Sequence, residues 1–384
     1  MAGGVPERPK GADCKSAGFA YGGSNPPAPT LLALLRELVE IESPTYSAGV
    51  RRVAEVCARE LETLGARTRF LEGNNLVADF DGAEAPLLLS GHADTVWPEG
   101  TLATMPFRAE NGRAYGPGVY DMKACLVVML EAIRLSTDRA NALRVFLTAD
   151  EEMGSRGARP HLEGAAAGCA AAFVVEPPGQ SGNLKTSRKG LGRFRLTITG
   201  RPAHAGTHRA DGISATEELA HQVLALHALN DDARGVSVNV GVVRGGTSEN
   251  VVAAEAEADI DVRVPTFADR DRLEATLASL EPHLEGATLT LSGGWTRPPL
   301  EPSAGSEKLL AQAQAHGREL GLDLGGESSG GGSDGNLIGA VGVPVLDGLG
   351  AEGGGAHAPD EHVLLDSMPQ RAELLSRLLR KPGI

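Results

Sequence analysis

The sequence predicts an α/β protein: a mostly parallel sheet flanked by helices, with an inserted α+β domain made of an antiparallel sheet plus two helices. Four apolar runs bounded by glycine and proline, with helix-like segments between them, are typical of buried parallel strands. A later region alternates apolar and polar residues with period two, as half-exposed antiparallel strands do. The 384 residues also exceed the size at which one hydrophobic core usually keeps growing, so two domains are expected.

The first predicted domain begins at residue 28 with alternating helix-like and strand-like segments. Helix-like patterns cover residues 30–43 and 50–66, and strand-like patterns cover residues 68–72 and 75–80. A further helix pattern covers residues 121–136, with Asp121 predicted as its N-cap. The four apolar runs lie at residues 85–94, 142–152, 169–178 and 342–357.

Residues 189–294 are predicted to form the inserted domain, a lid or dimerisation domain. Residues 295–384 return to helix and buried strand, so they are expected to complete the domain whose first part is 28–188. Glycine and proline residues occur at both predicted boundaries between the domains, and the chain can pivot there. Within the insert, strand-like patterns cover residues 192–201, 236–246 and 254–265, and helix-like patterns cover residues 213–229 and 269–284.

Residues 1–27 have a different character from the rest of the chain. They lack apolar periodicity and are dense in glycine, proline and serine, which predicts a flexible extension. Gly23-Ser24-Asn25-Pro26 is also what the T arm of a transfer RNA gene would encode. Our hypothesis is that this extension comes from a start codon placed too far upstream.

The composition excludes several classes of protein. A formal charge of −14 argues against a nucleic-acid partner or an anionic membrane surface, because both require clustered Lys and Arg. The four cysteines lie far apart, so neither a disulfide framework nor a thiolate metal site is indicated. The sequence has no apolar stretch of membrane-spanning length and no leader pattern at its start, so the expected location is the cytoplasm.

Each of the four apolar runs ends in side chains that can bind a metal ion. Because ligands of open α/β sheets bind outside the carboxyl ends of the strands, these side chains are expected to converge, and Asp121 can join them. Two imidazoles with carboxylates are donors that zinc accepts. Taken singly, each of these side chains could have an ordinary structural role. A histidine could be structural, an aspartate could cap a helix, and an acidic pair could lie in a solvated turn. The candidate metal ligands are His92, Asp121, Glu152, Glu176 and His357.

Spacing within these segments indicates two further roles. Asp94 follows His92 by two residues, so both side chains point to one side of an extended strand and Asp94 can orient the imidazole. Glu151 and Glu152 are adjacent and cannot easily perform one task together. One of them is expected to bind metal while the other, facing the substrate, is a ready general base.

These segments resemble those of a known family. The matching motifs are Ser90-Gly91-His92-Ala93-Asp94-Thr95-Val96, Gly116-Pro117-Gly118-Val119-Tyr120-Asp121-Met122-Lys123, Ala149-Asp150-Glu151-Glu152-Met153-Gly154-Ser155, Val175-Glu176-Pro177 and Gly355-Ala356-His357. The family is that of the two-zinc peptidases and includes glutamate carboxypeptidase, acetylornithine deacetylase, succinyl-diaminopimelate desuccinylase and the aminoacylases. Pro117, Glu176 and the His-Ala-Gly sequence that begins at His204 are most similar to the glutamate carboxypeptidase branch.

The resemblance implies two Zn²⁺ ions per subunit, for which Co²⁺ or Mn²⁺ can substitute. One ion would be held by His92, Asp121 and Glu176. The other would be held by Asp121, Glu152 and His357, with Asp121 bridging the two. The resemblance also implies that Glu151 is the base, which takes a proton from water and later delivers it to the leaving amine.

In the inserted domain the resemblance implies residues that act on the substrate. His204 would come from the partner subunit and stabilise the oxyanion, assisted by Asn250, which implies a homodimer through this domain. Arg263 and Arg297 resemble arginines that grip a substrate carboxylate. Alternatively, His204 is an ordinary surface residue and Asn250 an ordinary turn residue. Arg263 could likewise form an ion pair on the surface of a strand, and Arg297 could simply lie at a domain boundary.

The favoured function is metal-dependent hydrolysis of the amide bond in peptides or N-acyl amino acids with a free carboxylate, similar to glutamate carboxypeptidase. An N-acetyl or N-succinyl amino-acid deacylase of the acetylornithine deacetylase type is the alternative, with the same metals and base. An inactive metal-binding scaffold protein is disfavoured, because Glu151 has no task in it. No G-x-S-x-G sequence supports a serine hydrolase.

Overall fold

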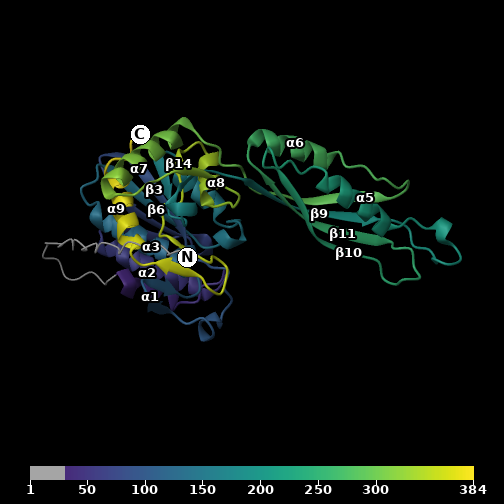
Figure 1. The fold of residues 1–384 in the computed structure, drawn as a ribbon, viewed down its shortest axis with the longest axis horizontal. Helices are drawn as coiled ribbons and strands as arrows, with labels where there is room; N and C mark the ends of the chain where they lie inside the picture. The colour runs from purple at the N-terminus through teal and green to yellow at the C-terminus, as the bar shows by residue number, and fades with distance from the viewer. Residues whose placement is uncertain (1–30) are drawn as a thin grey trace, which may run out of the picture.

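The computed structural model describes residues 31–384, so the predicted extension at residues 1–27 and its start-codon hypothesis lie outside the described residues. Figure 1 shows two lobes, a larger one that contains the central sheet and a smaller, elongated one that contains strands β9 to β11. The predicted fold class is confirmed, because a sheet with a parallel centre and a separate antiparallel sheet are both present.

The large lobe is built on a six-stranded sheet with the order β1-β2-β6-β3-β7-β14. Strands β6, β3, β7 and β14 pair in parallel, and β2 and β1 add antiparallel to one side. The apolar runs predicted as buried strands therefore form the parallel part of this sheet, with β14 at its edge. Its strands are β1 (Arg67–Phe70), β2 (Leu76–Phe80), β3 (Glu84–His92), β6 (Asn141–Thr148), β7 (Ala171–Val174) and β14 (Val345–Leu346).

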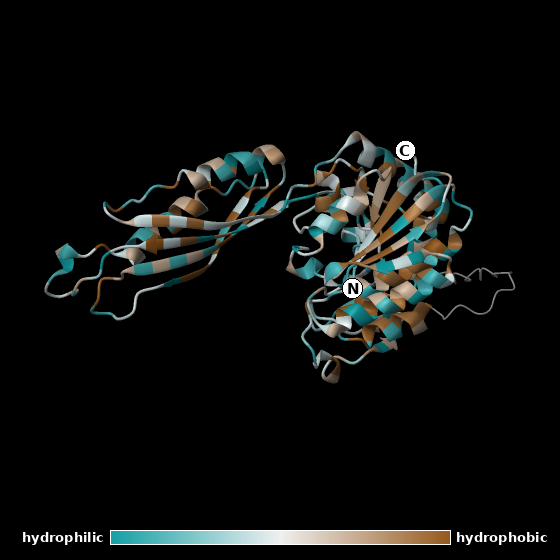
Figure 2. Ribbon diagram, turned by 180° about the vertical axis from the view of Figure 1, so that it is seen from behind, coloured by the Kyte–Doolittle hydropathy of each residue, from teal (hydrophilic) through white to brown (hydrophobic). Residues whose placement is uncertain are grey.

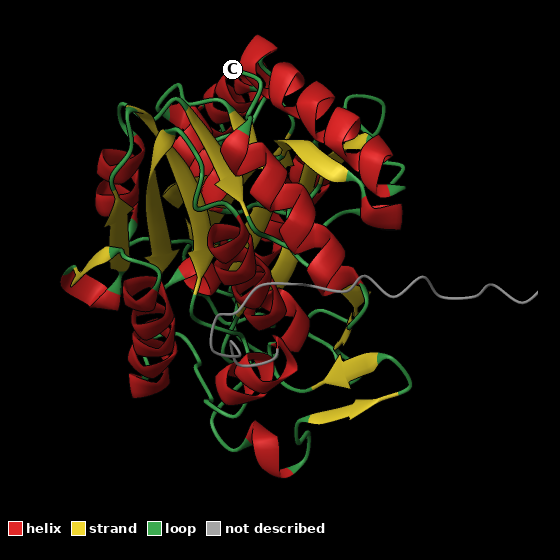
Figure 3. Ribbon diagram, turned by 90° about the vertical axis from the view of Figure 1, so that its left-hand side faces the viewer, coloured by secondary structure: helices red, strands yellow, loops and turns green. Residues whose placement is uncertain are grey.

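Helices cover both faces of this sheet, as Figure 3 shows. Successive residues of β3 point to opposite faces, so Leu87 and Leu89 join one core cluster while Leu88 joins another. Both clusters are apolar, and Figure 2 shows the strands of this lobe largely in the hydrophobic colour. The first face is covered by α1 (Leu31–Val39), α2 (Ala48–Thr63), α3 (Ala124–Leu135), α7 (Ala304–Leu320) and α9 (Ser367–Arg380), and the second by α4 (Arg159–Ala166) and α8 (Asp334–Ala340).

The small lobe is a four-stranded antiparallel sheet with the order β10-β11-β9-β12. Every second residue of β11, such as Ile260 and Val262, faces helices α5 and α6. The residues between them, such as Asp259 and Asp261, lie on the open face of the sheet. The elements are β9 (Gly190–Thr199), α5 (Ala215–His227), β10 (Ser237–Gly245), β11 (Glu255–Val264), α6 (Phe267–Ala278) and β12 (Thr288–Arg297). The positions along the chain that were predicted for the domain boundaries remain a prediction.

Shorter elements connect the main ones, mostly in the large lobe, whereas η6 belongs to the small lobe. They include two further small sheets and six one-turn helical segments. No helix among residues 31–384 is long and apolar enough to cross a bilayer. The short strands are β4 (Arg108–Glu110), β5 (Arg113–Tyr115), β8 (Leu184–Arg188), β13 (Gly326–Ser329), β15 (Gly353–Gly354) and β16 (His362–Leu364). The one-turn segments are η1 (Glu72–Asn74), η2 (Thr101–Ala103), η3 (Val119–Lys123), η4 (Glu151–Met153), η5 (Gln180–Gly182) and η6 (Arg209–Asp211).

Candidate active site

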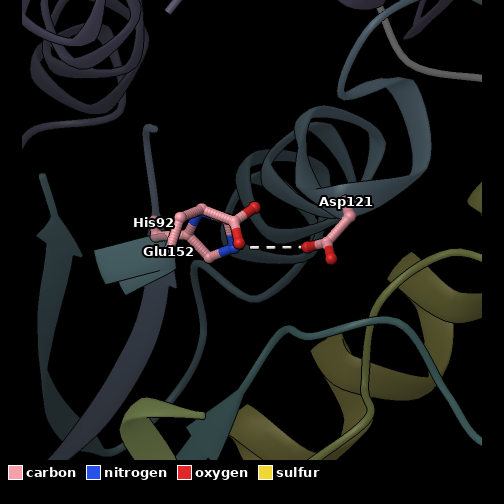
Figure 4. A group of neighbouring side chains, drawn as sticks. All are labelled: His92, Asp121 and Glu152. Carbon is pink, nitrogen blue, oxygen red and sulfur yellow. Dashed lines mark hydrogen bonds and ion pairs between the residues drawn. The ribbon is translucent and has the colours of Figure 1, made fainter. Parts of the chain in front are cut away.

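The candidate metal ligands meet at the carboxyl edge of the parallel strands. His92 is the last residue of β3, η4 with Glu152 follows β6, and Glu176 comes two residues after β7. Figure 4 shows the side chains of His92 and Asp121 directed toward each other. Ligand atoms of His92, Asp121 and Glu152 all lie within 4.8 Å of one another. The convergence expected from the strand ends is therefore present in the structure.

The close contacts divide these residues into two groups that share Asp121. On one side, His92 Nε2 lies 3.3 Å from Asp121 Oδ1 and 3.8 Å from Glu176 Oε1. On the other side, His357 Nε2 lies 3.3 Å from Asp121 Oδ2 and 3.6 Å from Glu152 Oε2. Each carboxylate oxygen of Asp121 thus faces a different imidazole, which is the arrangement of a bridging ligand.

The site is rich in negative charge that the neighbouring cations offset only in part. Burial raises the pKa of Glu176 to about 7, and repulsion from Asp121 adds to this effect. Burial also raises the pKa of Glu151 well above its usual range. Glu152 Oε1 is buried and has no hydrogen-bond partner among the described residues. Because a buried carboxylate oxygen without a partner is costly, these residues fit a site that receives cations.

Neighbouring carboxylates raise the pKa of both imidazoles, and Asp121 acts on each of them. Hydrogen bonds to Asp121 and Glu152 raise the pKa of His357 to about 10. Burial would lower the pKa of His92, but Asp121 and Asp94 together raise it well above its usual value. In return, the two histidines hold the pKa of Asp121 below its usual range, although burial opposes them. Bound cations would take the place of the protons that these histidines otherwise retain.

Asp121 does not cap a helix, so that prediction was wrong. Helix α3 begins at Ala124 with Lys123 as its N-cap residue, and Asp121 has an extended backbone (φ −113°, ψ 92°). Its backbone N–H donates to Glu361 Oε1 at 3.0 Å, as does that of Tyr120 at 2.9 Å. The segment is held from outside the helix, and this turns the Asp121 side chain toward the two histidines.

Glu361 is a site residue that the sequence analysis missed. Its other carboxylate oxygen accepts hydrogen bonds from the backbone N–H of Gly118 at 3.0 Å and from the Trp97 indole at 2.6 Å. Gly118 has φ +70°, and a Cβ there would lie 2.4 Å from the Thr95 side chain, so only glycine fits. The available signal was weak: an acidic residue four positions after His357, in a stretch with no periodic pattern.

Asp94 lies next to His92, and its backbone carbonyl is 2.9 Å from His92 Nδ1. Its Oδ1 is 3.4 Å from His92 Nδ1 and accepts from the backbone N–H of Glu151 at 3.1 Å. Its Oδ2 accepts from the backbone N–H of Glu152 at 3.2 Å and from the Thr45 hydroxyl at 2.7 Å. One carboxylate therefore connects the end of β3 to the turn that carries both glutamates.

Arg297 lies beside Glu151 in the interior of the large lobe. Its side chain is 4% exposed, and Nη2 donates to Glu151 Oε1 at 2.7 Å. Nη1 is 3.2 Å from Asp334 Oδ1. Asp334 also accepts hydrogen bonds from the hydroxyls of Thr148 and Ser155. Arg297, the last residue of β12, thus enters the large lobe and contacts the candidate base Glu151. The sequence analysis had instead expected Arg297 to bind the carboxylate of the substrate.

The remaining candidates lie in the small lobe. On β11, Arg263 Nε donates to Asp261 at 2.9 Å and Nη1 donates to the carbonyl of Gly330 at 2.9 Å. His204 and Asn250 lie together, since the backbone N–H of Ala205 donates to the carbonyl of Asn250. Both follow the ends of β9 and β10 that lie away from the large lobe, so the structure does not bring them to the metal-ligand cluster.

Comparison with known proteins gives consistent results. The family model for "Peptidase family M20/M25/M40" matches residues 88–381. Carboxypeptidase G2 from Pseudomonas sp. (strain RS-16) is 30% identical over 379 residues, covering 92% of this chain and 90% of that protein. Acetylornithine deacetylase from Pasteurella multocida (strain Pm70) is 31% identical over 267 residues, covering 63% and 69%. The crystal structure of aminopeptidase PepT from Bacillus cereus ATCC 10987 has a TM-score of 0.76 at 21% identity, covering 92% and 98%.

The family match spans more than half of the chain and includes all five candidate metal ligands, from His92 to His357. It confirms the family that the sequence motifs resemble, and with it the enzyme class, a metallopeptidase or amidohydrolase. The structural likeness independently supports the fold. The chain belongs to the peptidase family M20/M25/M40.

Proposed function

We propose that this protein hydrolyses the amide bond of peptides or N-acyl amino acids that carry a free carboxylate, in the manner of a glutamate carboxypeptidase. The observation that carries the proposal is the position of Asp121 between two imidazoles, with Oδ1 3.3 Å from His92 and Oδ2 3.3 Å from His357. A carboxylate shared in this way suits two metal ions that act together on one bond. Carboxypeptidase G2, at 30% identity over most of the chain, supports the choice of substrate class.

Two zinc ions fit the donors of this site. His92, Asp121 and Glu176 would hold one ion, and Asp121, Glu152 and His357 the other. Nitrogen and carboxylate oxygen are ligands that zinc accepts, and its close competitors Co²⁺ and Mn²⁺ can use the same set. Such ions, when bound, polarise the scissile carbonyl and make water acidic enough to lose a proton near neutral pH.

Glu151 is the proposed general base. Its backbone N–H is fixed by Asp94, and Arg297 holds one oxygen of its carboxylate at 2.7 Å. The carboxylate takes a proton from the attacking water and then gives that proton to the nitrogen of the leaving amine. Its side chain is 11% exposed, so little bulk water competes for the proton. A base of this kind contributes about 10²- to 10⁴-fold to rate.

The free carboxylate of the substrate is assigned to Arg263. This arginine lies on the open face of the small-lobe sheet, and its contact with Gly330 reaches across to the large lobe. A guanidinium can bind a carboxylate through two parallel hydrogen bonds. An N-acyl amino-acid deacylase remains the second candidate, because the acetylornithine deacetylase is a relative at 31% identity.

His204 is proposed to act in the site of a second subunit. Its Nδ1 accepts hydrogen bonds from the backbone N–H of Gly206 and Thr207, so the neutral ring carries its proton on Nε2 and can donate to an oxyanion. The ten-residue strand β9, about 30 Å long, separates it from the large lobe of its own chain.

An unpaired edge of the small-lobe sheet supports this homodimer. Strand β10 is one of the two edge strands of this sheet, and it exposes Val242 and Val243, with exposed fractions of 42% and 55%. Edge strands with exposed apolar residues readily pair with another chain. A second copy joined along β10 would extend the sheet and give each His204 a partner subunit to act on.

The test is release of free amino acid from a panel of N-acyl amino acids and C-terminal dipeptides. Metal-free protein, with and without added zinc, is compared with Glu151→Gln under the same conditions. We expect zinc-dependent turnover that falls about 10²- to 10⁴-fold in the variant. The variant should still bind two zinc ions, which is checked by elemental analysis. Turnover that needs no metal, or that survives the substitution, would contradict the proposal.

A further inference from the structure

A fully buried arginine on the last helix binds the backbone of two loops in the large lobe. Arg371, on α9, is 0% exposed, and none of its hydrogen bonds in the described chain goes to a carboxylate. Nε donates to the carbonyl of Gly350 at 2.9 Å, Nη1 to that of Gly182 at 3.0 Å and Nη2 to that of Gly348 at 2.5 Å. Because a buried charge without a counter-ion is costly, these three contacts are what keeps the guanidinium in the interior.

The segment 348–350 has few means of its own to hold its position. Two of its three residues are glycines, which have no side chain to pack. A Cβ on Gly350 would lie 2.2 Å from Cys125 Sγ and 2.5 Å from the carbonyl oxygen of Val175, so only glycine fits there. The planar fork of Arg371 binds the carbonyls at both ends of this segment and so supplies the missing fixed points.

The same segment supports the candidate metal ligand Glu176. It runs alongside the end of β7, where the backbone N–H of Leu349 donates to the carbonyl of Val174 at 3.2 Å. The backbone N–H of Gly350 donates to the carbonyl of Glu176 at 2.9 Å, and this is the only backbone hydrogen bond of Glu176 among residues 31–384. The position of this ligand therefore depends on the position of Gly350.

Other candidate ligands are supported in a different way. Glu361 accepts a hydrogen bond from the backbone N–H of Asp121, and Asp94 accepts one from that of Glu152. In the part of the chain that the structure describes, no carboxylate binds the backbone N–H of Glu176. Its support comes instead from the buried guanidinium, one hydrogen bond further away.

We propose that Arg371 is a positioning residue that fixes Glu176 through the segment 348–350. The inference rests on the proposed function, in which Glu176 binds one zinc ion together with His92 and Asp121. Arg371 touches neither the substrate nor the ligand side chains, so its effect should appear in the affinity of that one zinc site. A residue that only stabilises the fold would not distinguish between the two sites.

The experiment measures zinc affinity in Arg371→Lys and Arg371→Gln. Lysine keeps the charge and glutamine keeps a planar pair of N–H donors, but neither can bind three carbonyls as a guanidinium does. The urea unfolding transition of each variant is recorded first, and zinc is then titrated in competition with a chelating dye. We expect one ion to bind about 10- to 100-fold more weakly and the other as in the natural protein. Unchanged affinity at both sites, or equal losses at both, would overturn the proposal.

A double-mutant cycle tests whether the loss acts through Glu176. In Glu176→Gln protein this ligand is already removed, so adding Arg371→Lys should weaken the remaining zinc ion by less than about twofold. In His357→Gln protein the ion held with Glu176 remains, so the same addition should weaken it about 10- to 100-fold. A similar further loss in both backgrounds would contradict a role through Glu176.

Leu375→Ala is the matched control for stability. Leu375 is also 0% exposed and lies about one turn beyond Arg371 on α9, within the main core cluster. Truncating it leaves a cavity, so it should destabilise the fold while both zinc ions bind as before. A loss of zinc affinity equal to that of Arg371→Lys would overturn the proposal. Natural protein that binds fewer than two zinc ions would overturn the proposed two-ion site itself, whereas two ions held equally by natural protein and variants would overturn only the role of Arg371.

Discussion

At the scale of single residues, Arg297 is a side chain whose removal should destabilise the fold. It is 4% exposed and lies between Glu151 and Asp334, the latter 3% exposed, so its loss leaves two buried carboxylates without their cation. Breaking a buried pair of this kind typically costs about 3 to 5 kcal/mol. We expect Arg297→Met to lower the free energy of unfolding, measured in urea, by an amount in this range.

The control for Arg297 is an arginine with a similar ion pair in an exposed position. Arg195 lies 2.7 Å from Asp259 on the open face of the small-lobe sheet, with side chains 51% and 32% exposed. Exposed pairs contribute about 0 to 1 kcal/mol, so Arg195→Met should change stability little. Equal losses in the two variants would show that burial does not decide the effect.

At the scale of elements, the loop that carries Asp121 is held by Glu361. This carboxylate accepts hydrogen bonds from three backbone N–H groups of the loop and from Trp97. Glu361→Gln keeps the shape of the side chain but replaces one acceptor oxygen with an amide that faces donors. Loss of such outer contacts typically weakens metal binding about 10- to 100-fold, and we expect this loss in competition with a chelating dye.

Asp360 provides the comparison for that measurement. It directly precedes Glu361 and is exposed, and among the described residues its side chain has no hydrogen bond to the loop. Asp360→Asn therefore removes one charge near the site without touching the support of Asp121. If both variants lost zinc affinity equally, the effect would be one of charge and not of loop position.

The elements also show what could be predicted from the sequence and why. The strand ends were predictable, because apolar runs such as that of β3 are local patterns and parallel strands end at a common edge. The contacts of Glu361 with Asp121 and of Arg297 with Glu151 join residues 240 and 146 positions apart. Such contacts depend on loops with no periodic pattern. The loop that contacts Glu361 also gives Asp121 an extended backbone. Asp121 therefore does not form the helix cap that the surrounding sequence predicted.

At the scale of the whole molecule, the role proposed for His204 would need a second copy of the chain. It lies beyond the far end of β9, while Glu151 and the metal-ligand cluster lie in the large lobe. If each site takes its oxyanion donor from the partner subunit, then a single chain is incomplete however well its own ligands are placed. The dimer is then a condition for activity rather than only for stability.

Mixing two inactive variants tests this requirement. Glu151→Gln lacks the base and His204→Ala lacks the donor, so each homodimer should be nearly inactive. In a mixed dimer, the site on the His204→Ala subunit has its own Glu151 and receives His204 from its partner, so one site of two is complete. Half of the dimers are mixed after random exchange of equal amounts, so about a quarter of the natural activity should return. Activity that stays at the level of the separate variants, although exchange is shown by mass spectrometry of the mixed dimer, would place His204 outside the partner's site.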